Sequence, residues 1–139
     1  MVITVTVRNI VNHDLVQLEE TSSVRQAAEL MVKKDVGSIV ILREGTPFGI
    51  VTERDIIRKV VSIGKDPNSV RLATIMSSPL ITIDADSSLA DATELMLLKK
   101  IRRLLVLDNG KVVGIFTQRD LQEKVFNIIT ALNQVNASL

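Results

Sequence analysis

Hydroxyl, guanidinium and carboxylate side chains occur together twice in this sequence, in the same order and at the same spacing. The two segments are Gly49-Ile50-Val51-Thr52-Glu53-Arg54-Asp55 and Gly114-Ile115-Phe116-Thr117-Gln118-Arg119-Asp120. An Asp offers two acceptor oxygens that suit vicinal hydroxyls, while Thr and Arg can donate hydrogen bonds to phosphate oxygens. The combination suits recognition of a sugar phosphate better than it suits catalysis.

The same spacing is also a helix-start signal. A Thr followed three residues later by an Asp can satisfy free backbone N–H groups at a helix start, where a carboxylate also suits the helix dipole. A helix start that follows a strand equally offers its N–H groups to a phosphate. Gly49 and Gly114, three residues before each Thr, would leave room for a ligand to approach the backbone. Each segment taken alone permits either a structural cap or a binding site.

The two segments close two copies of one longer unit. Displacing the sequence by 65 residues aligns it with itself without a gap. The identical pairs include Ser22 with Ser87, Ser23 with Ser88, Ala27 with Ala92, Glu29 with Glu94, Leu30 with Leu95, Met31 with Met96, Lys34 with Lys99, Leu42 with Leu107 and Gly45 with Gly110. The match predicts an internal duplication. Residues 62–69 read as the linker because Gly64, Pro67 and Asn68 fall there.

Each copy reads as a strand, a helix, a hairpin of two strands and a second helix. The strand candidates are residues 15–18, 39–42 and 48–51 in the first copy and 80–83, 104–107 and 112–116 in the second. Capping-box patterns at Ser23-x-x-Gln26 and Ser88-x-x-Asp91 predict where the first helices begin. Short links that contain Gly favour antiparallel hairpins. A β-α-β-β-α unit of this size buries too little surface alone, so we expect the two copies to pack face to face.

The second helix of copy two carries a longer apolar stripe than its counterpart in copy one. Its members are Leu121, Val125, Ile128, Ile129, Leu132 and Val135. The stripe either covers the core or forms an exposed surface for a partner.

Composition narrows the class of protein. The 139 residues are 46% apolar with a formal charge of +1, which supports a folded core without the broad basic footprint of a general nucleic-acid binder. No apolar run approaches the ~20 residues of a membrane span, and no signal-peptide pattern is visible. The lack of cysteine and the single His13 exclude thiolate and multi-histidine metal sites. We expect a cytoplasmic globular protein with no metal and no membrane association.

One local cluster of basic side chains stands out against the near-neutral total. It consists of Lys99, Lys100, Arg102 and Arg103. These cations could suit the C-terminal end of a helix dipole or attract phosphate. Nucleic-acid binding is a lesser alternative, since single-strand readers use several stacking aromatic side chains and this chain has three Phe, no Tyr and no Trp.

The duplicated unit, with G-h-h-T-x-R-D closing each copy (h is an apolar residue), resembles a tandem pair of CBS domains, the assembly called a Bateman module. The resemblance runs from about Asn9 to Val125. It implies an α+β fold in which two β-α-β-β-α repeats, related by pseudo-two-fold symmetry, form one compact module. We expect repeat 1 over residues 9–64, repeat 2 over 71–127 and a C-terminal helix extension over 128–139.

The resemblance also implies what the module binds. CBS pairs hold adenosine-containing ligands such as AMP, ADP, ATP or S-adenosylmethionine in clefts between the repeats. By the family pattern, Asp55 and Asp120 would bind ribose hydroxyls, and Thr52 and Thr117 would contact ribose or phosphate. Val16 and Ile81 would line the base pockets. Arg54 and Arg119 would lie near the phosphates, and Arg102 and Arg103 would reach phosphate. The equivalents of this last pair in copy one are Gly37 and Ser38, so the two clefts should differ in affinity.

These observations predict a non-enzymatic regulatory module. No Ser or Cys nucleophile pairs visibly with His13, and an Arg beside each Asp favours the charged carboxylate over an acid catalyst. With no effector domain in these residues, the signal would pass in trans, to a partner protein or through a homodimer. The alternatives are a constitutive interaction scaffold that binds no ligand and a nucleic-acid-binding protein.

Overall fold

The chain folds as two compact units. The computed structural model describes residues 5–138. Leu15–Leu80 form one unit, and the described residues before and after them form the other. Each unit contains one three-stranded mixed sheet with its helices. The prediction of a mixed α+β fold built from two similar repeats is therefore confirmed.

The unit formed by Leu15–Leu80 contains the first repeat. Its elements are β1 (Gln17–Glu19), α1 (Val24–Lys34), β2 (Ser38–Arg43), β3 (Thr46–Thr52), α2 (Glu53–Ile56), a π-helical turn (Ile57–Val61) and a 3-10 turn (Leu72–Thr74). β1 runs parallel to β2, and β2 pairs antiparallel with β3. The hairpin turn has positive φ at both Glu44 and Gly45, which is the type I′ geometry that matches strand twist.

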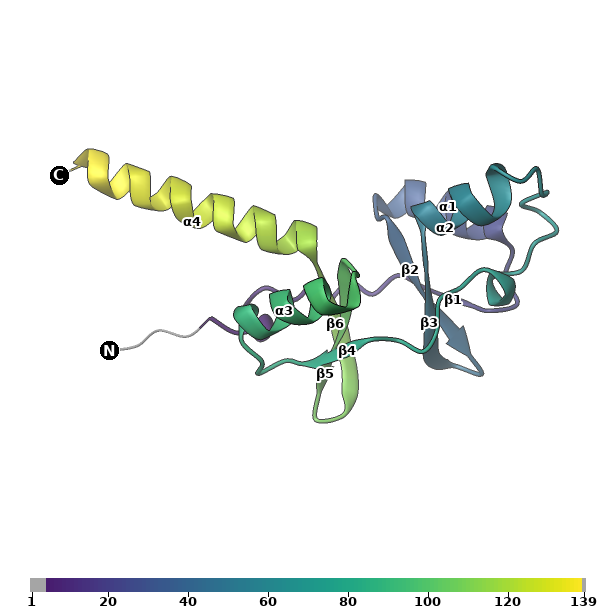
Figure 1. The fold of residues 1–139 in the computed structure, drawn as a ribbon, viewed down its shortest axis with the longest axis horizontal. Coiled ribbons are helices and arrows are strands. Elements are labelled where there is room, and N and C mark those ends of the chain that lie inside the picture. The colour runs from purple at the N-terminus through teal and green to yellow at the C-terminus, as the bar shows by residue number, and fades with distance from the viewer. Residues whose placement is uncertain (1–4, 139) are drawn as a thin grey trace. The chain divides into compact units, whose positions relative to one another are not determined.

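The other unit repeats this arrangement and ends in a longer helix. Its elements are a 3-10 turn (Val7–Asn9), β4 (Thr82–Asp84), α3 (Leu89–Lys99), β5 (Arg103–Asp108), β6 (Lys111–Thr117) and α4 (Gln118–Ser138). β4 is parallel to β5, and β5 is antiparallel to β6. Figure 1 shows α4 leaving the end of β6 as one unbroken helix.

Side-chain caps begin the first helix of each repeat, as predicted. In α1, the Ser23 hydroxyl accepts from the Gln26 N–H at 3.1 Å, and the Gln26 Oε1 accepts from the Ser23 N–H at 2.8 Å. In α3 only the first half of this exchange forms: the Ser88 Oγ accepts from the Asp91 N–H at 3.0 Å. The second capping box is therefore incomplete.

The segment that leads into each repeat packs against the other repeat. Val7 is fully buried in the core cluster that includes Ala92 and Phe116. Leu72, the equivalent residue 65 positions later, is fully buried in the cluster that includes Ile39. Because each leading segment closes the other repeat's core, the compact units do not follow the sequence period.

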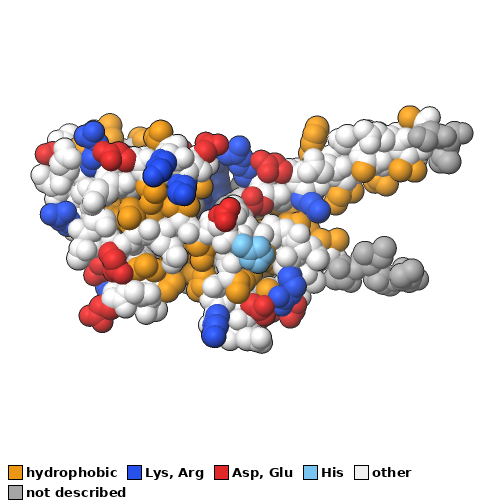
Figure 2. All heavy atoms as spheres, turned by 180° about the vertical axis from the view of Figure 1, so that it is seen from behind, with side chains coloured by type: hydrophobic (Ala, Val, Ile, Leu, Met, Phe, Trp, Pro, Cys, Tyr) orange, Lys and Arg blue, Asp and Glu red, His pale blue; other side chains and the backbone are white. Residues whose placement is uncertain are grey.

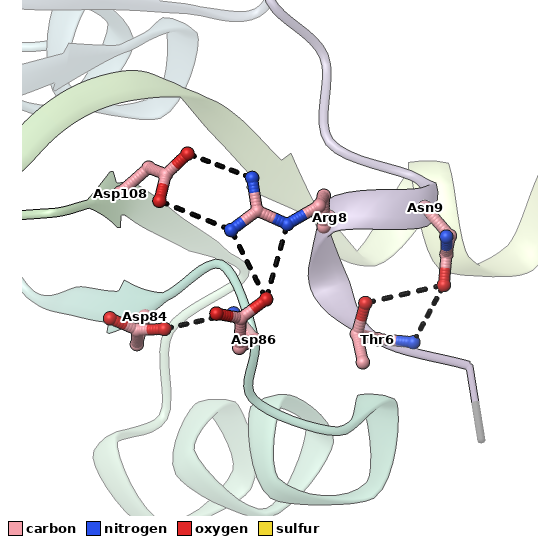
Figure 3. Close-up of polar contacts among 6 residues, drawn as sticks. All are labelled: Thr6, Arg8, Asn9, Asp84, Asp86 and Asp108. Carbon is pink, nitrogen blue, oxygen red and sulfur yellow. Dashed lines mark hydrogen bonds and ion pairs between the residues drawn. The ribbon is translucent and has the colours of Figure 1, made fainter.

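An ion-pair cluster fastens the N-terminal leading segment to the second repeat. The Arg8 Nη1 and Nη2 donate to the two carboxylate oxygens of Asp108 at 2.7 and 3.1 Å, and its Nε donates to Asp86 at 3.1 Å (Figure 3). These carboxylates raise the pKa of the Arg8 guanidinium, chiefly through the hydrogen bond with Asp108. The same hydrogen bond lowers the pKa of Asp108.

The two glycines before the Thr residues serve this packing and not a ligand. A Cβ placed on Gly114 would collide with the carbonyl oxygen of Asn12 and the side chain of Val11. At Gly49 it would lie 2.8 Å from the Met76 Sδ and 2.9 Å from the Ser77 carbonyl oxygen. The expectation that these positions leave room for a ligand is therefore wrong, because the chain's own leading segments occupy that space.

Candidate functional site

The first candidate junction lies where β3 passes into α2. Thr52 is both the last residue of β3 and the N-cap of α2. Its N–H donates to the Asp55 Oδ2 at 2.9 Å, and its Oγ1 accepts from the Asp55 N–H at 3.2 Å. The capping interpretation of this segment is therefore correct, and one carboxylate oxygen of Asp55 is committed to the cap.

The second junction, between β6 and α4, has the same geometry. The Thr117 N–H donates to the Asp120 Oδ2 at 2.9 Å, and the Thr117 Oγ1 accepts from the Asp120 N–H at 3.1 Å. Thr117 and Asp120 are both partly buried. Each helix cap thus uses one oxygen of its Asp, and the other oxygen lies outside the cap.

The remaining carboxylate oxygen distinguishes the two junctions. The Asp55 Oδ1 lies 3.2 Å from the Lys59 Nζ, which also donates to the Ile75 carbonyl at 2.8 Å. The equivalent Oδ1 of Asp120 has no hydrogen-bond or ion-pair partner among residues 5–138. Only the second junction therefore presents an acceptor oxygen that no side chain of the described chain occupies.

The strand partner of the junction threonine also differs between the two repeats. Arg103 lies directly across the strand pair from Thr117, whereas Ser38 lies across from Thr52. The Arg102 carbonyl accepts from the Gln118 N–H at 2.9 Å, which holds the start of β5 against the start of α4. The structure therefore brings Arg103, Thr117 and Asp120 to the same end of one hairpin.

The other predicted arginines do not approach the carboxylates of the junctions. Arg119 is exposed, and its Nε lies 3.3 Å from the Glu123 Oε1, one turn further along α4. Arg54 is also exposed and pairs with no acidic side chain within residues 5–138. Both lie in the first turn of a helix, where a guanidinium can reach outward to a phosphate.

The two apolar residues predicted to line base pockets occupy equivalent places. Val16 and Ile81 come directly before β1 and β4 and are partly buried. The Val16 carbonyl accepts from the Val40 N–H at 2.9 Å, and the Ile81 carbonyl accepts from the Leu105 N–H at 3.0 Å. Each side chain packs against the core of its own unit.

The remaining members of the basic cluster surround the end of α3. Lys99 is its last residue, and Lys100 takes the left-handed C-cap conformation with φ of 56°. Both are exposed, as is Arg102. Cations here complement the negative end of the helix dipole, so the structural interpretation accounts for the two lysines at least.

Lys59 is the site residue that sequence reasoning missed. Its contact with Asp55 follows the i,i+4 spacing that joins opposite charges on a helix face, so that pair was detectable. The second anchor, the Ile75 carbonyl, comes from the leading segment of the other repeat. The sequence period alone gives no sign of that contact.

The chain belongs to the CBS domain family. The family's sequence profile matches residues 7–62 and 72–127, so the resemblance seen in the sequence is confirmed. CBS pairs are generally regulatory and non-catalytic modules that bind adenosine ligands. The prediction of a regulatory module agrees with this general role of the family.

Known proteins similar to this chain include both sequence relatives and solved structures. An uncharacterized protein of Methanopyrus kandleri is 42% identical over 84% of this chain, and the match spans 61% of that relative's own length. An uncharacterized conserved protein from Pyrococcus horikoshii is 32% identical, with a TM-score of 0.82 over 90% of this chain and 95% of the other. A hexameric CBS-CP12 protein from bloom-forming cyanobacteria is 27% identical, with a TM-score of 0.81 over 88% of this chain and 72% of that one.

Two further features, a membrane-spanning helix and a group of metal ligands, are absent from residues 5–138. No helix there combines the length and apolar character needed to cross a membrane. Over the same residues, His, Asp and Glu side chains nowhere gather in a group of three that could hold a metal ion.

Proposed function

We propose that this chain is a regulatory module whose second junction binds an adenosine ligand. Asp120 accepts hydrogen bonds from the ribose hydroxyls through Oδ1, while Oδ2 keeps its place in the helix cap. Thr117 contacts ribose or phosphate, and Arg102, Arg103 and Arg119 attract the phosphates. The observation that carries this assignment is the Asp120 oxygen, which has no partner among residues 5–138.

The first junction is proposed as the weaker site. Thr52, Arg54 and Asp55 have the residue types that a nucleotide needs, but Lys59 already neutralises the Asp55 Oδ1. Ser38 also stands where the second repeat has Arg103. A ligand at this junction would have to displace a lysine, and it would lack the two arginines that Gly37 and Ser38 replace. Val16 and Ile81 are proposed to contact the adenine base at the first and second sites respectively.

The proposed ligands are AMP, ADP, ATP and S-adenosylmethionine. They share the adenosine group that the junction would recognise and differ in the charge presented to the arginines. We propose no catalytic step, because regulation requires only that the ligand bind two conformations with different affinity, typically by ~1–3 kcal/mol. The signal would pass in trans, to an effector protein or through a homodimer, in the cytoplasm.

Calorimetric titration of the full chain with each of the four ligands tests the proposal. We expect one of them to bind and to raise the melting temperature at millimolar concentration. Arg103→Met should weaken the binding of a phosphate-bearing ligand about tenfold or more, through the loss of a charged hydrogen bond. Lys111→Met is the matched control, since it removes an exposed cation from the far end of the same hairpin.

Two results would count against the proposal. If none of the four ligands binds, the alternative of a constitutive interaction scaffold replaces it. If Arg103→Met and Lys111→Met weaken binding equally, the arginine contributes only to the general charge of the protein and not to a site.

A further inference from the structure

The last helix exposes a continuous apolar face. In α4, Val125 and Ile128 are 44% and 43% exposed, and Ile129, Leu132 and Val135 are between 52% and 57% exposed. Figure 2 shows several orange side chains along the lower edge of the protruding helix, with others on its upper edge. Leu121, the first member of the stripe seen in the sequence, packs against the core of its own unit. From Val125 onward the stripe is exposed and does not cover that core.

The spacing of this face is that of a coiled-coil seam. The apolar positions 121, 125, 128, 132 and 135 follow alternating steps of four and three residues. Such a repeat, averaging 3.5 residues, keeps one narrow line of side chains facing a parallel or antiparallel helix. A seam of this kind is complementary to another helix with the same spacing.

The chemistry of the helix narrows the choice of partner. No charged residue occurs after Lys124 in the sequence, so this stretch offers nothing for a charged partner to recognise. Nor does it contain any charge that would repel an identical helix. Many of its residues are Val, Ile, Asn and Thr, which are weak helix formers, so packing must supply much of the helix's stability.

We propose that α4 pairs through this seam with α4 of a second copy of the chain. This inference is independent of nucleotide binding. A strip along residues 121–135 is about 22 Å long and about 10 Å wide, which gives roughly 450 Å² over two copies. Because stable interfaces bury at least about 1,000 Å², the pair formed by α4 alone is reversible and depends on concentration.

The mass of the full chain in solution tests this pairing. Sedimentation equilibrium over a range up to several hundred micromolar should show a reversible increase in mass with concentration. Leu132→Asp puts a charge within the seam and should weaken association about tenfold or more. Thr130→Asp is the matched control, because at 3.6 residues per turn residue 130 lies on the opposite side of α4.

A second variant separates loss of the seam from loss of the helix. Val125→Ala removes apolar surface but raises helix propensity, so weaker association in this variant reflects the seam. Circular dichroism of each variant at the lowest concentration records the helix content of the single copy.

Cross-linking locates the contact. The chain contains no cysteine, so Ile128→Cys introduces a single thiol at the midpoint of the seam. Two copies of residue 128 meet there whether the helices run parallel or antiparallel. We expect disulfide-linked dimers under mild oxidation for Ile128→Cys and few for Thr130→Cys.

The proposal is overturned if the chain keeps the mass of one copy throughout, whatever else then covers the apolar face. It is equally overturned if association occurs but Leu132→Asp leaves it unchanged, since the copies then meet through another surface. Equal cross-linking at positions 128 and 130 would also overturn it. The seam of one copy would then lie no nearer to the seam of the other copy than the opposite sides of the two helices lie to each other.

Discussion

Arg8 and Asp108, 100 residues apart in the chain, form a two-pronged ion pair at 2.7 and 3.1 Å. The contact ties the N-terminal leading segment to the start of the β5–β6 turn. It does so beside Val7, which the same segment inserts into the second repeat's core. A residue near the amino terminus thus stabilises a fold whose strands lie in the second half of the chain.

The first prediction concerns acid. The pKa of Asp108 is lower in the folded protein than its ordinary value of about 3.9. Its contribution to stability is therefore full above that value and is lost as the pH falls through the folded pKa. We expect Arg8→Leu to lower the melting temperature at neutral pH and to differ less from the parent below about pH 3.

Thermal unfolding of both proteins from neutral to acid pH makes the comparison. Arg25→Leu is the control, because it removes an ion pair to Glu29 within a single exposed helix face, and such pairs contribute little. A constant gap between Arg8→Leu and the parent at all pH values would mean that Arg8 acts through packing alone.

The second prediction follows from the exchanged leading segments. Leu72→Ala should cost about 2–5 kcal/mol, because it empties a fully buried position. Hydrogen exchange should then accelerate mainly in β2 and β3. Val7→Ala, at the equivalent position, should accelerate exchange mainly in β5 and β6. The opposite pattern would show that each leading segment packs with its own repeat in solution.

The third prediction concerns the close approach at the two glycines. Gly114→Ala should destabilise the protein by about 1–3 kcal/mol, since the added Cβ meets a backbone carbonyl and a branched side chain. Gly49→Ala should cost less, because its nearest neighbour is the flexible end of Met76. Urea unfolding measures both differences. Equal costs, or a larger one at Gly49, would contradict the closer backbone approach at Gly114.

The sequence was sufficient to predict the elements of each repeat. Strand pairing follows from apolar runs joined by turns such as Asn109-Gly110, whose positive φ angles the hairpin requires. The caps at Thr52 and Thr117 follow from the spacing of hydroxyl and carboxylate. These features depend on contacts between residues close in the chain, which is why local patterns reveal them.

Local sequence patterns could not predict the contacts between segments that are distant in the chain. Val7 and Leu72 are both apolar, so the sequence period identifies them as equivalent without indicating which core each one fills. A glycine that admits a neighbouring segment, as Gly114 does, has the same sequence signature as one that admits a ligand. The second carboxylate oxygen has a lysine partner in Asp55 and none within residues 5–138 in Asp120. This difference likewise depends on the Ile75 carbonyl, which holds Lys59 in place.

The last prediction tests the asymmetry between the junctions. In Asp120→Asn, the amide oxygen can still accept from the Thr117 N–H and preserve the cap, but the NH₂ group cannot accept from a ribose hydroxyl. Ligand affinity should fall by roughly 1–3 kcal/mol, about tenfold to a hundredfold, while unfolding changes little. Asp120→Ala should lose the same affinity and a further ~0.5–2 kcal/mol of stability with the cap.

Asp55→Asn is the matched comparison, because it makes the same chemical change at a junction whose second oxygen already binds Lys59. We expect it to leave the calorimetric affinity near that of the parent. If Asp55→Asn weakens binding as much as Asp120→Asn does, Lys59 does not close the first junction and both repeats contribute carboxylates to the ligand. If neither change affects binding, both carboxylates serve only their helix caps, and the ligand contacts must come from other residues.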